Sequence, residues 1–226
     1  LKNIVFRMAE VLQVDHKKKV LYTSTGTINY DILVLATGSV TNFFGNEAIA
    51  RQAMQLKSIS QALDIRSVFL QEFERAVQLT DVEDTVALKK ALNFVIVGAG
   101  PTGVEVAGAL AEIKRKILRK EYREVNPDMM EITLIDATSR ILATMSEKSS
   151  ERANDYLSKM GVRIMLNALV TSYDGHILLL KDGQEIHTET VIWAAGVKGN
   201  PVKGLLDDAY LPNGRLIVDE FNLIKG

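Results

Sequence analysis

Short apolar runs separated by polar turns open this chain, and that alternation predicts a series of short β-strands. The last of these runs is the most apolar and ends at Thr37-Gly38, where a glycine marks a turn. Within residues 3–38 the expected strands are Ile4–Phe6, Glu10–Val14, Val20–Tyr22, Ile28–Tyr30 and Ile32–Ala36.

The same layout of apolar runs and turns returns in residues 161–196. The expected strands there are Val162–Leu166, Ala168–Ser172, Ile177–Leu180, Glu185–His187 and Thr190–Ala194, and the last leads into Ala195-Gly196. An ungapped offset of 158 aligns Ala36 with Ala194 and Gly38 with Gly196. Few residues are identical, so the shared pattern alone predicts a structural repeat.

Helical spacing of apolar residues appears between the two copies. We expect helices over Lys57–Leu79, Asp81–Leu92 with Thr80 or Asp81 as N-cap, and Thr102–Val125, a turn at Asn126–Asp128, and a last short strand at Leu216–Asp219. The first copy has no counterpart of residues 94–160. Because the chain also begins with Leu1 rather than Met, we expect it to be a piece of a longer protein whose missing half precedes Leu1.

Composition narrows the function. With 226 residues, 47% of them hydrophobic, and a net charge of −1, the chain resembles a soluble α/β protein, with nothing that suggests nucleic acid as a partner. No run approaches the ~20 apolar residues that span a bilayer. The absence of cysteine excludes disulfides, thiolate metal sites and redox dithiols, and the three histidines lack metal-ligand spacing. We therefore expect no metal site.

The segment Asn93–Gly108 contains the strongest chemical signal. An apolar, β-branched strand runs into Gly98, Gly100 and Gly103 in the order G-x-G-x-x-G, and a helix of small residues follows. This is the context that a dinucleotide fingerprint requires: a tight turn, close backbone approach to a pyrophosphate, and close packing of helix on strand. Pro101 suits the first helical turn, whose free N–H groups and positive end favour phosphates.

A second strand, Glu131–Asp136, ends in a carboxylate where a ribose acceptor is expected. An acid there can bind the adenosine ribose hydroxyls and repel a 2′-phosphate, so Asp136 favours NAD(H) over NADP(H). The spacing from the glycines exceeds the usual ~20 residues, and the excess lies in Lys114–Asp128. Arg140 is a candidate for binding a 2′-phosphate, but a lone surface arginine is the better interpretation.

Four motifs together carry a family resemblance across nearly the whole chain. They are Tyr30–Gly38, Val97–Glu112, Leu134–Ala137 with Arg140–Leu142, and Val191–Val197. With them the chain resembles the two-dinucleotide-domain flavoprotein reductases of the pyridine nucleotide-disulfide oxidoreductase superfamily, and most closely the type II NADH dehydrogenases (NADH:quinone oxidoreductases). In that family an FAD domain is interrupted by an NAD(H) domain of similar fold.

The resemblance implies roles for particular residues. Gly98, Gly100, Pro101, Thr102 and Gly103 would surround the pyrophosphate, Asp136 the ribose, Glu105 and Ala195-Gly196 the nicotinamide end, and Thr37-Gly38 would lie near FAD. Asp136 replaces the commoner glutamate. Glu105 has an alternative interpretation as an acid favoured by the helix dipole. Trp193 is better interpreted as a core residue than as a partner that stacks on a ligand ring. Lys114–Lys116 is better interpreted as a solvated helix face than as a site for anionic lipid.

We therefore predict an α/β fold: a Rossmann-like NAD(H)-binding domain with a parallel sheet, helices and a β-meander, flanked by remnants of an interrupted FAD-binding domain. The expected boundaries are residues 1–45 for the β-meander remnant, 46–205 for the NAD(H)-binding domain and 206–226 for the return segment. The family's first fingerprint, its C-terminal Gly-Asp motif and its membrane-facing tail are absent.

By the same resemblance the parent protein passes hydride from NADH to FAD and then electrons to a quinone, while this piece binds NAD(H) weakly, retains no FAD and is inactive. The parent would be cytoplasmic, peripheral on the inner face of the membrane through a missing segment, and a homodimer is one arrangement open to it. Two alternatives remain: a reductase with a ferredoxin or disulfide acceptor, and a non-catalytic NAD-binding module. The lack of cysteine here argues against a thioredoxin-reductase arrangement.

Overall fold

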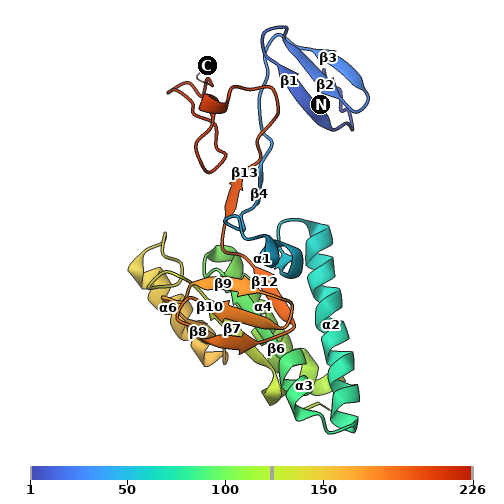
Figure 1. The fold of residues 1–226 in the computed structure, drawn as a ribbon, viewed down its shortest axis with the longest axis vertical. Coiled ribbons are helices and arrows are strands. Elements are labelled where there is room, and N and C mark those ends of the chain that lie inside the picture. The colour runs from blue at the N-terminus through green and yellow to red at the C-terminus, as the bar shows by residue number, and fades with distance from the viewer. Residues whose placement is uncertain (1, 123–124, 225–226) are drawn as a thin grey trace. The chain divides into compact units, whose positions relative to one another are not determined.

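The computed structural model describes residues 2–122 and 125–224 (Figure 1). The chain forms two compact units, one of Leu1–Val40 with Val197–Gly226 and one of Thr41–Gly196. The unit boundaries thus fall at 40/41 and 196/197, whereas the sequence pattern placed them at 45/46 and 205/206. The larger unit is the continuous stretch of chain that holds the glycine fingerprint.

A five-stranded parallel sheet forms the centre of the larger unit. Its strands, in spatial order, are β5 (Met54–Gln55), β12 (Thr190–Trp193), β6 (Asn93–Val97), β7 (Glu131–Ile135) and β8 (Arg163–Met165). In this register Val95 lies between Val191 and Thr133. The middle strands are apolar along nearly their whole length because a parallel sheet is covered on both faces. The predicted α/β class with a parallel sheet is confirmed.

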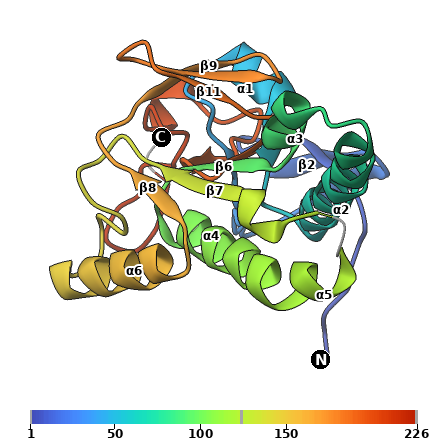
Figure 2. The same cartoon turned by 90° about the horizontal axis from the view of Figure 1, so that it is seen from below.

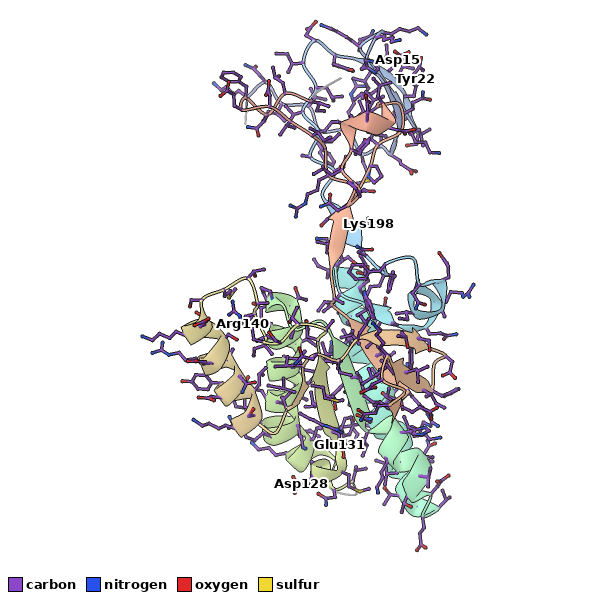
Figure 3. The ribbon with its side chains drawn as sticks, turned by 60° about the vertical axis from the view of Figure 1, so that its left-hand side comes forward. Asp15, Tyr22, Asp128, Glu131, Arg140 and Lys198 are labelled. Atoms are coloured by element: carbon purple, nitrogen blue, oxygen red, sulfur yellow. The ribbon has the colours of Figure 1, made fainter. Side chains whose placement is uncertain are left out.

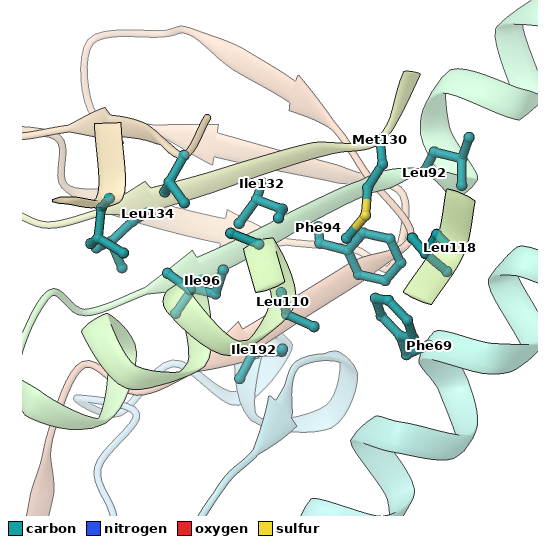
Figure 4. Packing of buried hydrophobic residues seen from close by; sticks show 14 of the residues in the cluster. Phe69, Leu92, Phe94, Ile96, Leu110, Leu118, Met130, Ile132, Leu134 and Ile192 are labelled. Atoms are coloured by element: carbon teal, nitrogen blue, oxygen red, sulfur yellow. The ribbon is translucent and has the colours of Figure 1, made fainter. Parts of the chain in front are cut away.

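Helices cover one face of this sheet. Figure 2 shows α4 (Pro101–Ile113) and α6 (Glu147–Lys159) on the same side of β6, β7 and β8. The core beneath them also receives α2 (Ile59–Asp81) and α3 (Thr85–Ala91). The rings of Phe69, Phe73 and Phe94 pack together there, with centroids 5.0 Å apart for Phe69–Phe73 and 5.1 Å apart for Phe69–Phe94. Figure 4 shows Phe69 and Phe94 in this core.

The opposite face is covered by an antiparallel meander and by α1 (Glu47–Gln52). The meander consists of β9 (Val170–Tyr173), β10 (Ile177–Leu180) and β11 (Glu185–His187), with β10 in the middle. Tyr173 and Leu178 are buried against Val95, Ile135 and Trp193. These strands agree with those expected from the pattern of residues 161–196.

Two helix boundaries show how local hydrogen bonds decide where a helix begins. Ser58 caps α2 through a capping box with Gln61. The expected cap of the next helix, Thr80 or Asp81, is wrong: α2 continues to Asp81, the Thr80 hydroxyl donates to the carbonyl of Ala76, and Asp84 caps α3 instead. A hydroxyl bonded back within its own helix cannot cap the next one.

The single helix expected over Thr102–Val125 is interrupted. After α4 the chain makes a π-helical turn at Lys114–Leu118, then α5 (Arg119–Glu121), and a 3-10 turn at Pro127–Met129. The π-helical turn buries Leu118 in the core, while the Lys114 ammonium donates to the carbonyl of Met130 at 2.6 Å. Residues 123–124 of the expected helix lie outside the described residues.

The smaller unit contains a second antiparallel meander, formed by β1 (Val11–Asp15), β2 (Val20–Thr23) and β3 (Gly26–Asn29). A separate pair joins β4 (Ser39–Thr41) and β13 (Val197–Gly199), and a 3-10 turn spans Asp207–Ala209. Each half of the predicted repeat therefore has its three-stranded meander.

Three expected strands of the smaller unit are wrong. Ile4–Phe6 and Ile32–Ala36 have no strand structure, and Leu216–Asp219 makes only isolated bridges, from Leu216 to Tyr210 and from Val218 to Ile224. Ile32 and Val34 are 86% and 82% exposed. In the described part of this unit no strand lies alongside residues 32–36, so their backbone has no ladder to join.

Candidate functional site

The glycine loop follows β6 at the carboxyl edge of the parallel sheet, where ligands bind in open α/β folds. Gly98 has φ +107°, and a Cβ there would stand 2.5 Å from backbone atoms of Ala194 and Ala195. A Cβ on Gly103 would stand 1.8 Å from the carbonyl oxygen of Gly98. Both glycines are therefore required by packing of the loop against its neighbours.

Gly100 differs from the other two fingerprint glycines. No described atom lies within 4 Å of the position that its Cβ would take. The fold itself therefore does not require glycine here, and the open space beside the backbone is available to a ligand. This is the feature expected of a glycine that lets a pyrophosphate approach the chain closely.

The N-terminus of α4 faces this open space. Gly100 is the N-cap, Pro101 is the first helical residue, and among the described residues no side chain caps the helix. The N–H groups of Thr102 and Gly103 have no acceptor within the helix, because the first turn of a helix leaves its donors free. Free N–H groups at the positive end of this 13-residue helix favour the binding of an anion.

Asp136 follows β7 and fixes the glycine loop through its carboxylate. Its Oδ2 accepts from the Ala99 N–H at 2.5 Å, and its Oδ1 accepts from the Thr138 N–H at 2.7 Å. The Thr138 hydroxyl donates to Oδ1 as well, at 2.6 Å. The N–H of Leu142 donates to the Ala99 carbonyl at 2.8 Å. Ala99 is thus held on both its polar groups by the segment that follows β7.

The guanidinium of Arg140 belongs to this same segment. It donates to the carbonyls of Ala143 at 2.7 Å and Met145 at 3.1 Å, so it braces its own loop. In Figure 3 Arg140 lies beyond one end of β7, and Glu131, the first residue of that strand, lies at the other. Arg140 is engaged with backbone oxygens rather than aimed outward at a phosphate.

The end of β12 forms the other side of the site. Trp193 is buried, its indole N–H donates to the Asn42 carbonyl at 2.9 Å, and its ring stacks on Phe43 with centroids 5.7 Å apart. Its role in the core is therefore visible directly. Ala195 and Gly196 follow, and the Gly196 carbonyl accepts from the Asn42 N–H at 3.0 Å.

A cavity of about 400 Å³ opens beside these elements. Gly98, Asp136, Thr138, Ala195 and Phe44 are among the residues that line it. The cavity therefore reaches from the carboxylate after β7, past the first glycine of the fingerprint, to the end of β12. A dinucleotide is expected to lie along this line of the sheet edge.

The structure brings most of the predicted site residues together in the larger unit. Glycines 98, 100 and 103, Pro101, Thr102, Asp136, Ala195 and Gly196 all lie at the carboxyl edge of the sheet, and Glu105 is exposed on the second turn of α4. Thr37 and Gly38 lie in the smaller unit, where the Thr37 hydroxyl donates to the Asn200 carbonyl at 2.8 Å. They form no part of the site described above.

Sequence reasoning missed the contacts that Ala99, Thr138 and Leu142 make and the position of Phe44. Leu142 lies within the motif Arg140–Leu142, so the sequence did indicate that it is near the site. Thr138 and Phe44 had none, because a threonine after a strand and two phenylalanines in a connection occur in many folds.

Within residues 2–122 and 125–224, three or more His, Asp or Glu side chains nowhere gather closely enough to hold a metal ion. The helices of that same part of the chain include none long and apolar enough to cross a membrane.

Known proteins offer a comparison for this geometry. The sequence model of the family described as pyridine nucleotide-disulphide oxidoreductase matches residues 1–223. Type II NADH:quinone oxidoreductase NdhA of Mycobacterium tuberculosis is 35% identical, over all of this chain and 50% of that protein. A type II NADH:quinone oxidoreductase of Haemophilus influenzae is 31% identical, over 80% of this chain and 42% of its own. The chain spans about half the length of these relatives or less.

Solved structures show the same fold at lower identity. NDH2 from Plasmodium falciparum, in a complex with NADH, matches 84% of this chain and 40% of its own with a TM-score of 0.75 and 24% identity. A ferredoxin reductase from Rhodopseudomonas palustris matches 87% and 42%, with a TM-score of 0.64 and 20% identity. At these identities the likeness concerns the fold alone.

Proposed function

This chain belongs to the pyridine nucleotide-disulphide oxidoreductase family, and we propose that it is the NAD(H)-binding portion of a flavoprotein NADH dehydrogenase. The parent protein would pass hydride from NADH to FAD and electrons onward to a quinone. The names of the relatives, type II NADH:quinone oxidoreductases, support this proposal. Because the chain spans about half of those proteins, the activity, the quinone and any membrane contact or homodimer belong to the proposed parent.

One observation carries the proposal: at the carboxyl edge of the parallel sheet, the carboxylate of Asp136 holds the loop whose Gly100 has open space beside it and caps a helix with free N–H groups. The residues present fit NAD(H). The free N–H groups of the first turn of α4 would bind the pyrophosphate, and the space beside Gly100 would let it approach. Glu105 and Ala195-Gly196 remain proposed neighbours of the nicotinamide end.

Asp136 has room for one more hydrogen bond. A carboxylate offers about four acceptor positions, and three are used by Ala99 and Thr138. We propose that the remaining position, on Oδ2, accepts one hydroxyl of the adenosine ribose. A 2′-phosphate would meet the negative charge instead, and Arg140 is committed to its own loop. Both features favour NAD(H) over NADP(H).

The residues present do not make a flavin site. Thr37-Gly38 ends a segment with no strand structure, and the sequence contains one glycine fingerprint, which the NAD(H) site uses. We propose that the chain alone retains no FAD and does not turn over. In the parent, the two cofactors supply the hydride chemistry, while this chain binds the nicotinamide cofactor and orients it. The parent is proposed to be peripheral on the inner face of the membrane.

The test is an NADH titration that uses Trp193, the single tryptophan, as the reporter. Its emission overlaps the absorption of reduced nicotinamide, so bound NADH should quench it. We expect saturable quenching, and about tenfold weaker binding for Asp136→Ala, since losing a hydrogen bond to a charged group costs about 1.5 kcal/mol or more. The matched control is Asp182→Ala, which removes the same charge in the β10–β11 turn, outside the cavity lining.

Two results would overturn the proposal. One is the absence of saturable quenching by NADH. The other is equal binding by the wild type and Asp136→Ala. NADPH tests the specificity. It should bind to the wild type more weakly than NADH does, and the difference between the two affinities should be smaller in Asp136→Ala.

A further inference from the structure

Phe44 has a backbone conformation that bulky residues rarely adopt. Its φ is +54°, and Gly45 after it has φ +78°. A left-handed backbone brings Cβ too close to the following carbonyl and costs about 1–2 kcal/mol for a residue other than glycine. Even so, the Phe44 side chain is 68% exposed, so it gains little from burial. An exposed ring on a strained backbone needs a reason other than packing.

The neighbours of Phe44 impose this conformation. The Asn42 side-chain oxygen accepts from the Phe44 N–H at 2.9 Å, and Phe43 stacks on Trp193. On the other side, the Asn46 N–H donates to the Phe43 carbonyl at 3.0 Å and the Asn46 amide donates to the Thr171 carbonyl at 2.7 Å. The ring is therefore directed by anchored residues on both sides, an arrangement found where strain serves a ligand site.

The ring lies at the cavity of the dinucleotide site. Phe44 lines this cavity together with Gly98 and Asp136. Its Cζ is 3.3 Å from the position that a Cβ on Gly196 would take, so the ring lies against the end of β12. In the sheet, β12 and β7 flank β6 on opposite sides. Phe44 thus lies across the glycine loop from Asp136.

We propose that Phe44 is a binding residue whose ring forms an apolar wall for the nicotinamide end of the dinucleotide. This inference rests on the proposed NAD(H) function. If Asp136 takes the adenosine ribose and the glycine loop takes the pyrophosphate, the other ring of the cofactor falls on the β12 side. A flat aromatic side chain there offers an offset-stacked or edge contact to a planar ring. ADP-ribose, which lacks nicotinamide, would make no use of it.

The experiment compares NADH and ADP-ribose by calorimetry on the wild type, Phe44→Ala and Phe44→Tyr. We expect Phe44→Ala to weaken NADH by about three- to tenfold, the range of an aromatic contact, and to leave ADP-ribose unchanged. Phe44→Tyr keeps the ring and should keep the affinity. Phe221→Ala, which truncates an exposed phenylalanine in the smaller unit, is the matched control and should change neither ligand.

A stability measurement separates binding from structure. Phe44→Gly removes the strain, since glycine tolerates positive φ, and should raise the midpoint of thermal unfolding while it weakens NADH. A residue needed only for the fold would lower that midpoint. Wild type that fails to bind NADH overturns both proposals. Two other results would overturn this inference and leave the NAD(H) function standing. One is an equal affinity of the wild type and Phe44→Ala for NADH, and the other is an equal loss of affinity for NADH and ADP-ribose in Phe44→Ala.

Discussion

The two halves of the repeat share a sequence pattern and a three-stranded meander, but their last apolar runs differ in structure. In the second copy, residues 190–193 form β12, which lies between β5 and β6 in the parallel sheet, and Ile192 is fully buried. In the first copy, 158 positions earlier, Val34 is 82% exposed and residues 32–36 form no strand. The second run has β5 and β6 beside it, while the described chain provides the first with no such neighbours. A parallel strand therefore depends on segments distant in sequence.

A meander forms in each half, although the two differ in burial. β1–β3 and β9–β11 both form, because antiparallel strands joined by tight turns pair with their own neighbours. Their packing differs: Leu178 in β10 is fully buried against the parallel sheet, whereas Tyr22 in β2 is 36% exposed. Local pattern is enough for a hairpin, and burial requires the rest of the domain.

The largest difference between the copies should appear in amide hydrogen exchange. Amides of Val191–Trp193 should exchange on the order of a thousandfold or more slowly than those of Leu33–Leu35, because core strands open only with a free energy near that of global unfolding, about 5 kcal/mol or more. Mass spectrometry of peptides from both segments makes the comparison within one sample. Similar protection in the two segments would contradict the exposed state of the first run.

Truncation at matched positions should give the next largest difference. Ile192→Ala should lower the free energy of unfolding by about 2–5 kcal/mol, because it leaves a cavity in a close-packed core. Val34→Ala, at the equivalent position of the first copy, should change it by no more than about 0.5 kcal/mol. Urea unfolding followed by Trp193 fluorescence reports both. A comparable loss from Val34→Ala would show that residues 32–36 are buried in solution.

The smallest expected effect is on the pH dependence of stability, through an aspartate in the first turn of each meander. The N–H groups of Ile177 and His176 hold the pKa of Asp174 below its ordinary 3.8, and the N–H of Lys18 does the same for Asp15. Each charged carboxylate therefore stabilises its turn above pH 3.8, and this contribution is lost as the pH falls through the lowered pKa. Asp174→Asn should flatten the acid limb of the unfolding midpoint against pH, and Asp15→Asn should do so less. A steeper acid limb in Asp174→Asn would reverse the assigned sign.

Much of the larger unit could be predicted because its signals are local. Strands β6, β7, β10 and β12 coincide with apolar runs, and the α2 boundary follows from Ser58 and its capping box. The errors have a common cause. Each depends on partners that the local pattern does not contain. The three features are the hydrogen bond of the Thr80 hydroxyl, the π-helical turn after α4 and the strand pairing of residues 32–36.

The candidate site divides in the same way. Gly98 and Gly103 could be found from their spacing, because the fingerprint states which backbone positions must be tight, and Asp136 could be found from its place at the end of the second strand. The bond from Ala99 to Asp136 joins positions 37 apart, and no spacing rule predicts it. The Phe44 ring, which lies 3.3 Å from the position that a Cβ on Gly196 would take, is brought there from still farther away in the sequence. Roles assigned by motif remain predictions for the titrations above.

The hydrogen bond between Ala99 and Asp136 matters for redesign of cofactor preference. The usual way to admit a 2′-phosphate is to delete the acid after the second strand, yet here the same carboxylate holds the loop that would receive the pyrophosphate. Asp136→Ala would therefore cost affinity for both cofactors. Asp136→Asn removes the charge but keeps only one oxygen, whereas the N–H groups of Ala99 and Thr138 both donate to the present carboxylate. One of these donors would then face an amide NH2 group, so an engineer who changes cofactor preference at this position must also replace the acceptor that the loop loses.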